Sequence, residues 1–266
     1  GIMTIMGDFL GMYAIGSGAT WYEGTDYTNP AHRKNMLKKI KEMVLEFRGE
    51  PFVLLWLLGN ENNYGVANNA NKKPEEYYLF ADQAAKLIKK LDPEARPVAI
   101  GNGDLLFLDI YGKKTKYIDI LGANAYRGDK GCGYSFWQDV KDYTGRPTMI
   151  TEYGCPSYSE RMPSGQAELA QAEYLKGAWE DIKTNSAAGP GVGNCIGAIV
   201  FEWLDEWWKS YDPFVHNVQR NWAGPFPDGW MYEEWLGIMS QGDGTQSPFL
   251  RVPKKSYFMF KSTWKK

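Results

Sequence analysis

Six short apolar runs, each bounded by turn-forming residues, recur along the chain. They cover residues 2–6, 52–58, 97–100, 118–121, 148–151 and 196–201. An unbroken run of this kind, rich in β-forming residues, is typical of a strand that is buried on both faces. The pattern therefore predicts six strands of a parallel sheet.

Helical patterns lie between these runs. Asn29 and Pro30 are typical of a helix cap and first turn, Pro74 opens a second helix, and Ser164 opens a third. Apolar residues recur on one face after each of these starts. Strands that alternate with helices predict an α/β fold, in which helices cover a parallel sheet.

The number of strands bears on the architecture. A TIM-type (β/α)8 barrel closes with eight strands, whereas this chain shows six and opens inside an apolar run. We therefore expect a single barrel domain over residues 1–266 that lacks its first two βα units and contains strands three to eight. An N-terminal segment outside this chain or a second copy of it would complete the barrel. Residues 205–248, rich in Gly, Pro and Trp, predict a long loop after the eighth strand that walls the substrate cleft.

Composition excludes several classes of function. The net charge is −2 at pH 7 and the basic residues are scattered, which argues against a nucleic-acid partner. No apolar run reaches the roughly 18 residues of a membrane span. Three separated cysteines and two histidines leave little material for a disulfide framework or a zinc centre, so we expect no metal or cofactor. The 15% aromatic content suits either a carbohydrate site or a bulky core.

Two of the apolar runs end in a glutamate. The run 52–59 leads into Asn60 and Glu61, and the run 147–151 leads into Glu152. A carboxylate just past the C-terminal end of a buried strand lies at the rim where barrels and α/β folds keep their chemistry. Two carboxylates from different strands are the minimum equipment for cleaving a glycosidic bond.

Four short motifs in chain order carry a family resemblance. They are Leu58-Gly59-Asn60-Glu61, Asn124-Ala125-Tyr126, Ile150-Thr151-Glu152-Tyr153-Gly154 and Phe201-Glu202-Trp203. In this order the sequence resembles the clan of retaining glycoside hydrolases that share a (β/α)8 barrel, and it is most similar to the barrel domain of glycoside hydrolase family 2. The segment 151–155 also resembles the nucleophile strand of the family 72 glucanosyltransferases.

The resemblance implies a role for each site residue. Glu61 would be the acid/base and Glu152 the nucleophile, with their carboxyl groups about 5–5.5 Å apart. Asn60 and Asn124 would bind substrate, and Tyr126 would hydrogen-bond the nucleophile. Tryptophans would stack on sugars, with Trp203 as the floor of the site and further contacts from the loop that holds Trp207 and Trp208, although part of that loop's aromatic residues would pack beneath it.

The resulting hypothesis is a glycosidase that hydrolyses β-linked oligosaccharide or polysaccharide by double displacement. A β-glucan transglycosylase would use the same carboxylates but exclude water from the second step. A carbohydrate-binding barrel remnant would keep the aromatic site without turnover. A polysaccharide substrate would favour a secreted or periplasmic protein.

Overall fold

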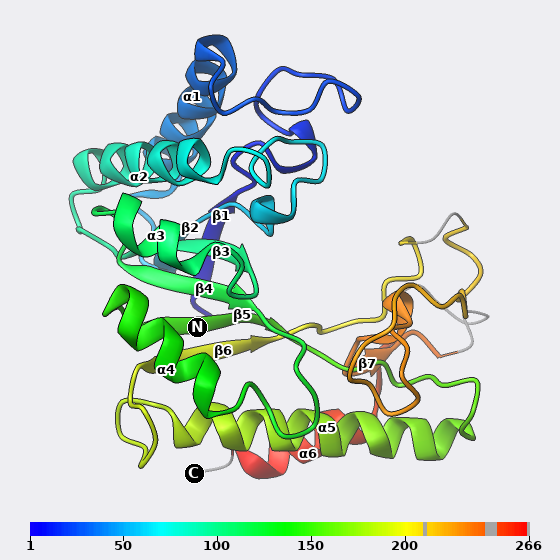
Figure 1. Ribbon diagram of the computed structural model, residues 1–266. Helices are drawn as coiled ribbons and strands as arrows, with labels where there is room; N and C mark the ends of the chain where they lie inside the picture. The colour runs from blue at the N-terminus through cyan, green and yellow to red at the C-terminus, as the bar shows by residue number, and fades with distance from the viewer. Residues whose placement is uncertain (210–211, 243–248, 265–266) are drawn as a thin grey trace. The chain divides into compact units, whose positions relative to one another are not determined.

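The computed structural model describes residues 1–209, 212–242 and 249–264. Its main sheet has six strands in the chain order β1-β2-β3-β4-β5-β6 (Figure 1). These strands span Thr4–Asp8, Val53–Leu58, Val98–Gly103, Ile120–Asn124, Thr148–Tyr153 and Cys195–Val200. Each predicted run therefore forms a strand, and β1 to β4 pair in parallel. The α/β class and the six strands of a TIM-type barrel are confirmed.

The chain divides into two compact units. Unit 1 comprises Gly1–Asn124 and Phe136–Met149, and unit 2 comprises Ala125–Ser135 and Ile150–Lys266. Strand β5 contributes its first residues to unit 1 and its last four to unit 2. The single domain over residues 1–266 stays a prediction.

In unit 1 the strands bury apolar side chains on both faces of the sheet. Leu55 and Leu57 of β2 share one layer with Ala99, Ile120 and Met149. The next residue along the strand points the opposite way, so Trp56 is buried on the other face and donates from Nε1 to Asp92 at 2.9 Å. Burial of such side chains contributes roughly 1.5–3 kcal/mol each.

Two long helices, α1 (Pro30–Phe47) and α2 (Pro74–Leu91), lie side by side in unit 1 (Figure 1). The predicted cap is present, because the Asn29 side chain accepts a hydrogen bond from the backbone of Ala31 at 2.8 Å. Helices α3 (Leu108–Lys114) and α4 (Tyr134–Thr144) were not predicted. Gly112 lowers the helix propensity of α3. It is needed there because a Cβ at this position would lie 2.2 Å from the Tyr143 carbonyl oxygen.

In unit 2, helix α5 (Ser164–Thr184) lies alongside α6 (Lys255–Thr263) (Figure 1). The Ser256 hydroxyl donates to the buried Gln171 side chain at 2.7 Å, and the rings of Trp179 and Trp264 meet edge to face. Helix α6 therefore stays packed although it has only nine residues. Among the described residues, no helix combines the length and the apolarity that crossing a membrane needs.

The segment 205–248 is folded where the structure describes it; residues 210–211 and 243–248 lie outside the described residues. It contains the 3-10 turn η3 (Glu233–Trp235) and β7 (Met239–Ser240), which pairs antiparallel with β8 (Val252–Pro253). At its start, the buried Asp205 carboxylate accepts a hydrogen bond from the buried Lys254 ammonium at 2.5 Å. Removing one partner of a buried pair costs about 3–5 kcal/mol, so this contact anchors the segment to the chain before α6.

Candidate active site

Glu61 lies in a tight turn that follows β2. Its backbone is in the left-handed region, with φ at 57°, and its amide donates to the Gly101 carbonyl oxygen at 2.9 Å. A Cβ at residue 101 would lie 2.6 Å from the carbonyl oxygen of Gly59. Only glycine lets β3 come this close to the turn, so Gly101 helps to place Glu61 at the strand end.

Asn124, the last residue of β4, binds both residues of the Asn-Glu motif. Its Nδ2 donates to Asn60 Oδ1 at 3.0 Å and to Glu61 Oε1 at 3.1 Å. Asn124 is 3% exposed, so its amide is fixed in place. Within unit 1 the structure therefore brings together three predicted site residues, Asn60, Glu61 and Asn124.

Asn62 is a further member of this group that the sequence patterns did not reveal. It is fully buried, its Oδ1 accepts from the Asn60 amide at 2.8 Å, and its Nδ2 donates to the Tyr27 hydroxyl at 2.8 Å. The same Nδ2 lies 3.1 Å from the carbonyl oxygens of Phe9 and Leu10. Asn62 thus ties the Glu61 turn to the loop after β1. Its neighbours in space are distant in sequence, so spacing alone gave no signal.

Glu152 lies within β5 and is held from the chain that follows β4. The Tyr126 hydroxyl donates to Glu152 Oε2 at 2.9 Å, and the Ala125 amide donates to the Glu152 carbonyl oxygen at 2.8 Å. At Gly154 a Cβ would lie 2.2 Å from the Phe201 carbonyl oxygen and 3.2 Å from the Tyr126 ring. Glycine at this position lets Tyr126 approach the strand. Unit 2 therefore contains the predicted tyrosine–glutamate pair.

The three predicted tryptophans differ in exposure. Trp203 and Trp208 are 56% and 57% exposed, and the Trp203 ring meets Tyr257 edge to face. Trp207 is buried and stacks on His216, which in turn stacks on Trp235 at 3.5 Å between ring centroids. Trp203 and Trp208 thus retain surface for a ligand, whereas Trp207 packs within the loop.

A third glutamate, Glu202, follows β6. Burial, followed by the nearby charge of Glu206, raises the pKa of its carboxyl group to about 9, whereas Lys209 opposes the shift. Its Oε1 is buried and has no hydrogen-bond partner among the residues described. Lys209 pairs instead with Glu206 at 2.8 Å and Glu233 at 3.2 Å. At neutral pH Glu202 is therefore a neutral acid.

A hollow of about 260 Å³ in unit 1 adjoins the Asn-Glu motif. Its lining consists of Gly7, Asp8, Phe9, Leu57, Gly59 and Asn60. Asp8 ends β1 and accepts a hydrogen bond from the Leu10 amide at 2.7 Å. Burial raises the pKa of the Asp8 carboxyl group, while that hydrogen bond and the more distant Lys39 lower it. The lining thus offers one carboxyl group and no cationic side chain.

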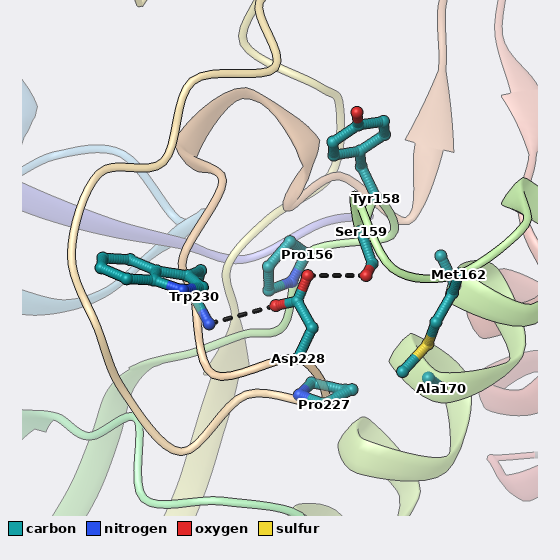
Figure 2. Close-up of a pocket in the computed structure, with 9 residues that line it drawn as sticks. Pro156, Tyr158, Ser159, Met162, Ala170, Pro227, Asp228 and Trp230 are labelled. Carbon is teal, nitrogen blue, oxygen red and sulfur yellow. Dashed lines mark hydrogen bonds between the residues drawn. The ribbon is translucent and has the colours of Figure 1, made fainter.

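A second pocket, in unit 2, is too small for a sugar. It encloses about 10 Å³, which is room for about one water molecule. Figure 2 shows Asp228 at its centre, with Ser159 Oγ donating at 2.6 Å to one carboxylate oxygen and the Trp230 amide donating at 3.1 Å to the other. Asp228 therefore fastens the segment 227–230 to the loop that precedes α5.

Chemistry other than that of carboxyl groups has little support in the described part of the chain. Within it, no three His, Cys, Asp or Glu side chains are grouped so that they could hold a metal ion. Cys155 and Cys195 are free thiols, and burial raises the pKa of the Cys155 thiol well above its usual range. A buried thiol of this kind stays protonated and is a poor nucleophile.

Comparison with known proteins identifies the family. Residues 11–179 match the family described as glycosyl hydrolases family 2, TIM barrel domain. The match covers more than half of the chain, and the chain belongs to this family. The resemblance to the barrel domain of glycoside hydrolase family 2 is confirmed, and three of its four motifs lie within the matched residues.

A curated relative is the probable mannan endo-1,4-β-mannosidase C of Aspergillus terreus (strain NIH 2624 / FGSC A1156). It is 33% identical over 95 residues, which are 32% of this chain and 23% of the relative. This chain therefore spans about a quarter of that relative's length.

Solved structures share the fold. A family 2 β-galacturonidase from Eisenbergiella tayi bound to galacturonate is 19% identical with a TM-score of 0.56, over 90% of this chain and 38% of that one. A Bifidobacterium dentium β-glucuronidase complexed with coumarin-3-O-glucuronide is 17% identical with a TM-score of 0.57. The match covers 90% of this chain and 35% of that one. The Faecalibacterium prausnitzii β-glucuronidase is 21% identical with a TM-score of 0.54. The match covers 90% of this chain and 36% of that one.

Proposed function

We propose that the chain is the catalytic barrel part of a retaining glycosidase that hydrolyses β-linked carbohydrate, with Glu152 as nucleophile and Glu61 as acid/base. The observation that carries the proposal is the pair of hydrogen bonds from one strand end. Asn124 donates to Glu61, and Tyr126, two residues further along the chain, donates to Glu152. Each carboxyl group is thereby oriented by a neutral donor, as a mechanism with two fixed carboxylates requires.

In the first step the Glu152 carboxylate attacks the anomeric carbon and forms the glycosyl–enzyme ester. The glycosidic C–O bond breaks, and Glu61 gives its proton to the leaving oxygen. In the second step Glu61, now ionised, takes a proton from water, whose oxygen displaces Glu152 from the anomeric carbon. Asn60 binds the 2-hydroxyl group of the sugar, a contact that strengthens in the transition state.

The stereochemistry of the first product tests this mechanism. An aryl β-glycoside should release the β-anomer first, followed by mutarotation in the proton NMR spectrum. An α-anomer as the first product would mean an inverting enzyme and would remove the nucleophile role of Glu152. Binding without turnover would favour the barrel remnant, and transfer to an added sugar acceptor would favour the transglycosylase.

The hollow beside Asn60 supports neutral sugars as substrates. A uronic acid bound there would bring a second carboxylate next to Asp8, and like charges that are partly desolvated repel. The uronidases among the solved structures share the fold at low identity, whereas the curated relative is a probable mannan mannosidase. We therefore place neutral β-glycosides, β-mannosides among them, ahead of β-uronides.

A substrate panel combined with one substitution tests this preference. The unmodified chain should hydrolyse an aryl β-mannoside or β-glucoside with a higher kcat/KM than the matching β-glucuronide. Asp8→Asn keeps the shape and removes the charge, so it should narrow that ratio. A ratio that favours the uronide, or one that Asp8→Asn leaves unchanged, would contradict the role of Asp8.

A further inference from the structure

The loop after β1 presents a row of partly exposed aromatic rings. Phe9, Tyr13 and Trp21, here called the aromatic row, are 43%, 36% and 56% exposed. The ring centroids of Phe9 and Tyr13 are 6.1 Å apart. Those of Tyr13 and Trp21 are 5.8 Å apart, with ring planes within 6° of parallel. A contiguous exposed patch of large rings is typical of a binding surface.

The loop that carries the row is fixed by buried hydrogen bonds. Its backbone enters the left-handed region at Leu10 and Tyr13, which are not glycines, with φ values of 48° and 55°. Such conformations persist only where the surroundings hold them. The Tyr27 hydroxyl donates to the Leu10 carbonyl at 2.8 Å, and the Thr25 hydroxyl donates to that of Gly11 at 2.7 Å. The backbone between Phe9 and Tyr13 is therefore fixed in advance of any ligand, which lowers the entropic cost of binding.

The row is continuous with the hollow beside the Asn-Glu motif. Phe9 belongs to both, because it lines the hollow together with Asp8 and Asn60 and also contacts Tyr13. Asn62, one residue after Glu61, donates to the Phe9 carbonyl oxygen. One buried side chain, that of Asn62, thus joins the Glu61 turn to the backbone of Phe9, the first residue of the row.

We infer that the aromatic row is a subsite for the sugar units that adjoin the one in the hollow, and that it selects neutral β-linked oligosaccharides over single sugars. This inference rests on the proposed glycosidase function. Pyranose rings have apolar C–H faces that pack on aromatic rings, while their hydroxyl groups remain in water. The rings of the row carry no charge and offer a uronic acid carboxylate no ion pair, which favours a neutral glycan as the ligand.

Binding without turnover tests the subsite. In a Glu152→Gln background, calorimetry would compare Trp21→Ala with Tyr22→Ala for mannotetraose, cellotetraose, laminaritetraose and an aryl monoglycoside. Tyr22 is the matched control, because it is 98% exposed and stacks on none of the described rings. Loss of Trp21 should weaken binding of the preferred tetrasaccharide about three- to tenfold, the value of one aromatic contact. Trp21→Phe should retain most of the affinity, and Tyr22→Ala all of it.

The outcomes separate this inference from the proposed function. Trp21-dependent binding of a tetrasaccharide together with absent hydrolysis would sustain the subsite and overturn the glycosidase. Hydrolysis together with equal affinities for Trp21→Ala and Tyr22→Ala would overturn the subsite alone. Equal losses for tetrasaccharide and monoglycoside, or no binding of any tetrasaccharide, would also overturn it. Self-association that Trp21→Ala abolishes, without any effect on sugar binding, would assign the row to a second copy of the chain.

Discussion

The end of β2 and the end of β5 each present a glutamate, and the two are held differently. Glu61 lies beyond its strand, in a left-handed turn, and accepts a hydrogen bond from an amide. Glu152 lies inside its strand, where its own carbonyl oxygen is also bonded, and accepts a hydrogen bond from a phenol. One carboxyl group is thus supported by a turn, the other by the sheet.

This difference fits the proposed division of roles. A nucleophile must approach the anomeric carbon from one fixed direction. A position within a strand favours this because the sheet holds the backbone of the residue in place. An O–H donor to an ionised carboxylate makes a strong, charge-assisted bond, and the Tyr126 hydroxyl supplies such a donor to Glu152. The acid/base must exchange a proton in both steps, and the Asn124 amide orients it without a titratable proton of its own.

Removing Glu152, the proposed nucleophile, should have the largest effect of the substitutions that test this comparison. Glu152→Gly should lower kcat by more than about 10⁴-fold, beyond what loss of acid–base catalysis costs, because no covalent intermediate can form. Added azide should then restore turnover by attacking the same face and giving the inverted α-glycosyl azide. A rescued β-azide would exchange the roles of Glu152 and Glu61, and thermal unfolding would check that the variant is folded.

Replacing Glu61, the proposed acid/base, should give a smaller loss of activity, and its size should depend on the substrate. Glu61→Ala should lower kcat/KM about 10²–10⁴-fold for substrates with poor leaving groups, because these need a proton in the first step. Activated aryl glycosides need little protonation of the leaving group, so their kcat/KM should fall much less. Measuring kcat/KM across a series of leaving-group pKa values checks this. A loss of equal size along the whole series would assign Glu61 another role.

The sequence supported the outline of this site better than its details. Buried strands read as apolar runs, so β2, β5 and the glutamates at their ends were predictable from pattern alone. The sequence patterns did not predict the role of Asn62 or the aromatic row. Their neighbours in space are brought together by turns that contain left-handed residues such as Leu10 and Glu61. Hydrophobic periodicity carries no signal for such turns.

The tryptophans show the same limit. Their number predicted stacking surfaces but gave no order of burial, and Trp207 and Trp208 differ in exposure although they are adjacent. The partner that decides this is His216, which stacks on Trp207 from a position nine residues further along the chain. Side chains in irregular segments are placed by such contacts, which sequence spacing does not encode.

A milder change sharpens the comparison at the donor of Glu152. Tyr126→Phe removes a hydrogen bond to a charged group, worth about 1.5–3 kcal/mol, so kcat should fall about 10- to 100-fold. Tyr153→Phe is the matched control, because the Tyr153 hydroxyl is buried without a hydrogen-bond partner among the described residues. That control should change kcat by less than about twofold. Equal effects of the two substitutions would mean that Tyr126 acts through packing and not through its hydroxyl group.

The smallest expected effect concerns Glu202, the glutamate without a hydrogen bond to its buried Oε1. Its folded pKa of about 9 exceeds the ordinary value of 4.5, so its contribution to stability is fully present below pH 4.5 and is lost as the pH rises towards 9.

The substitution Glu202→Gln keeps the shape of the side chain and removes its titration. The free energy of unfolding should therefore match that of the unmodified chain at pH 4 and exceed it at pH 8 by about 1 kcal/mol, a value discounted for the partial exposure of the side chain. Urea unfolding at the two pH values measures this difference. If Glu202→Gln instead destabilises the chain at pH 8, then Glu202 is ionised and paired in the folded state. In that case Glu202 would not differ from Glu61 and Glu152 in lacking a hydrogen-bond donor.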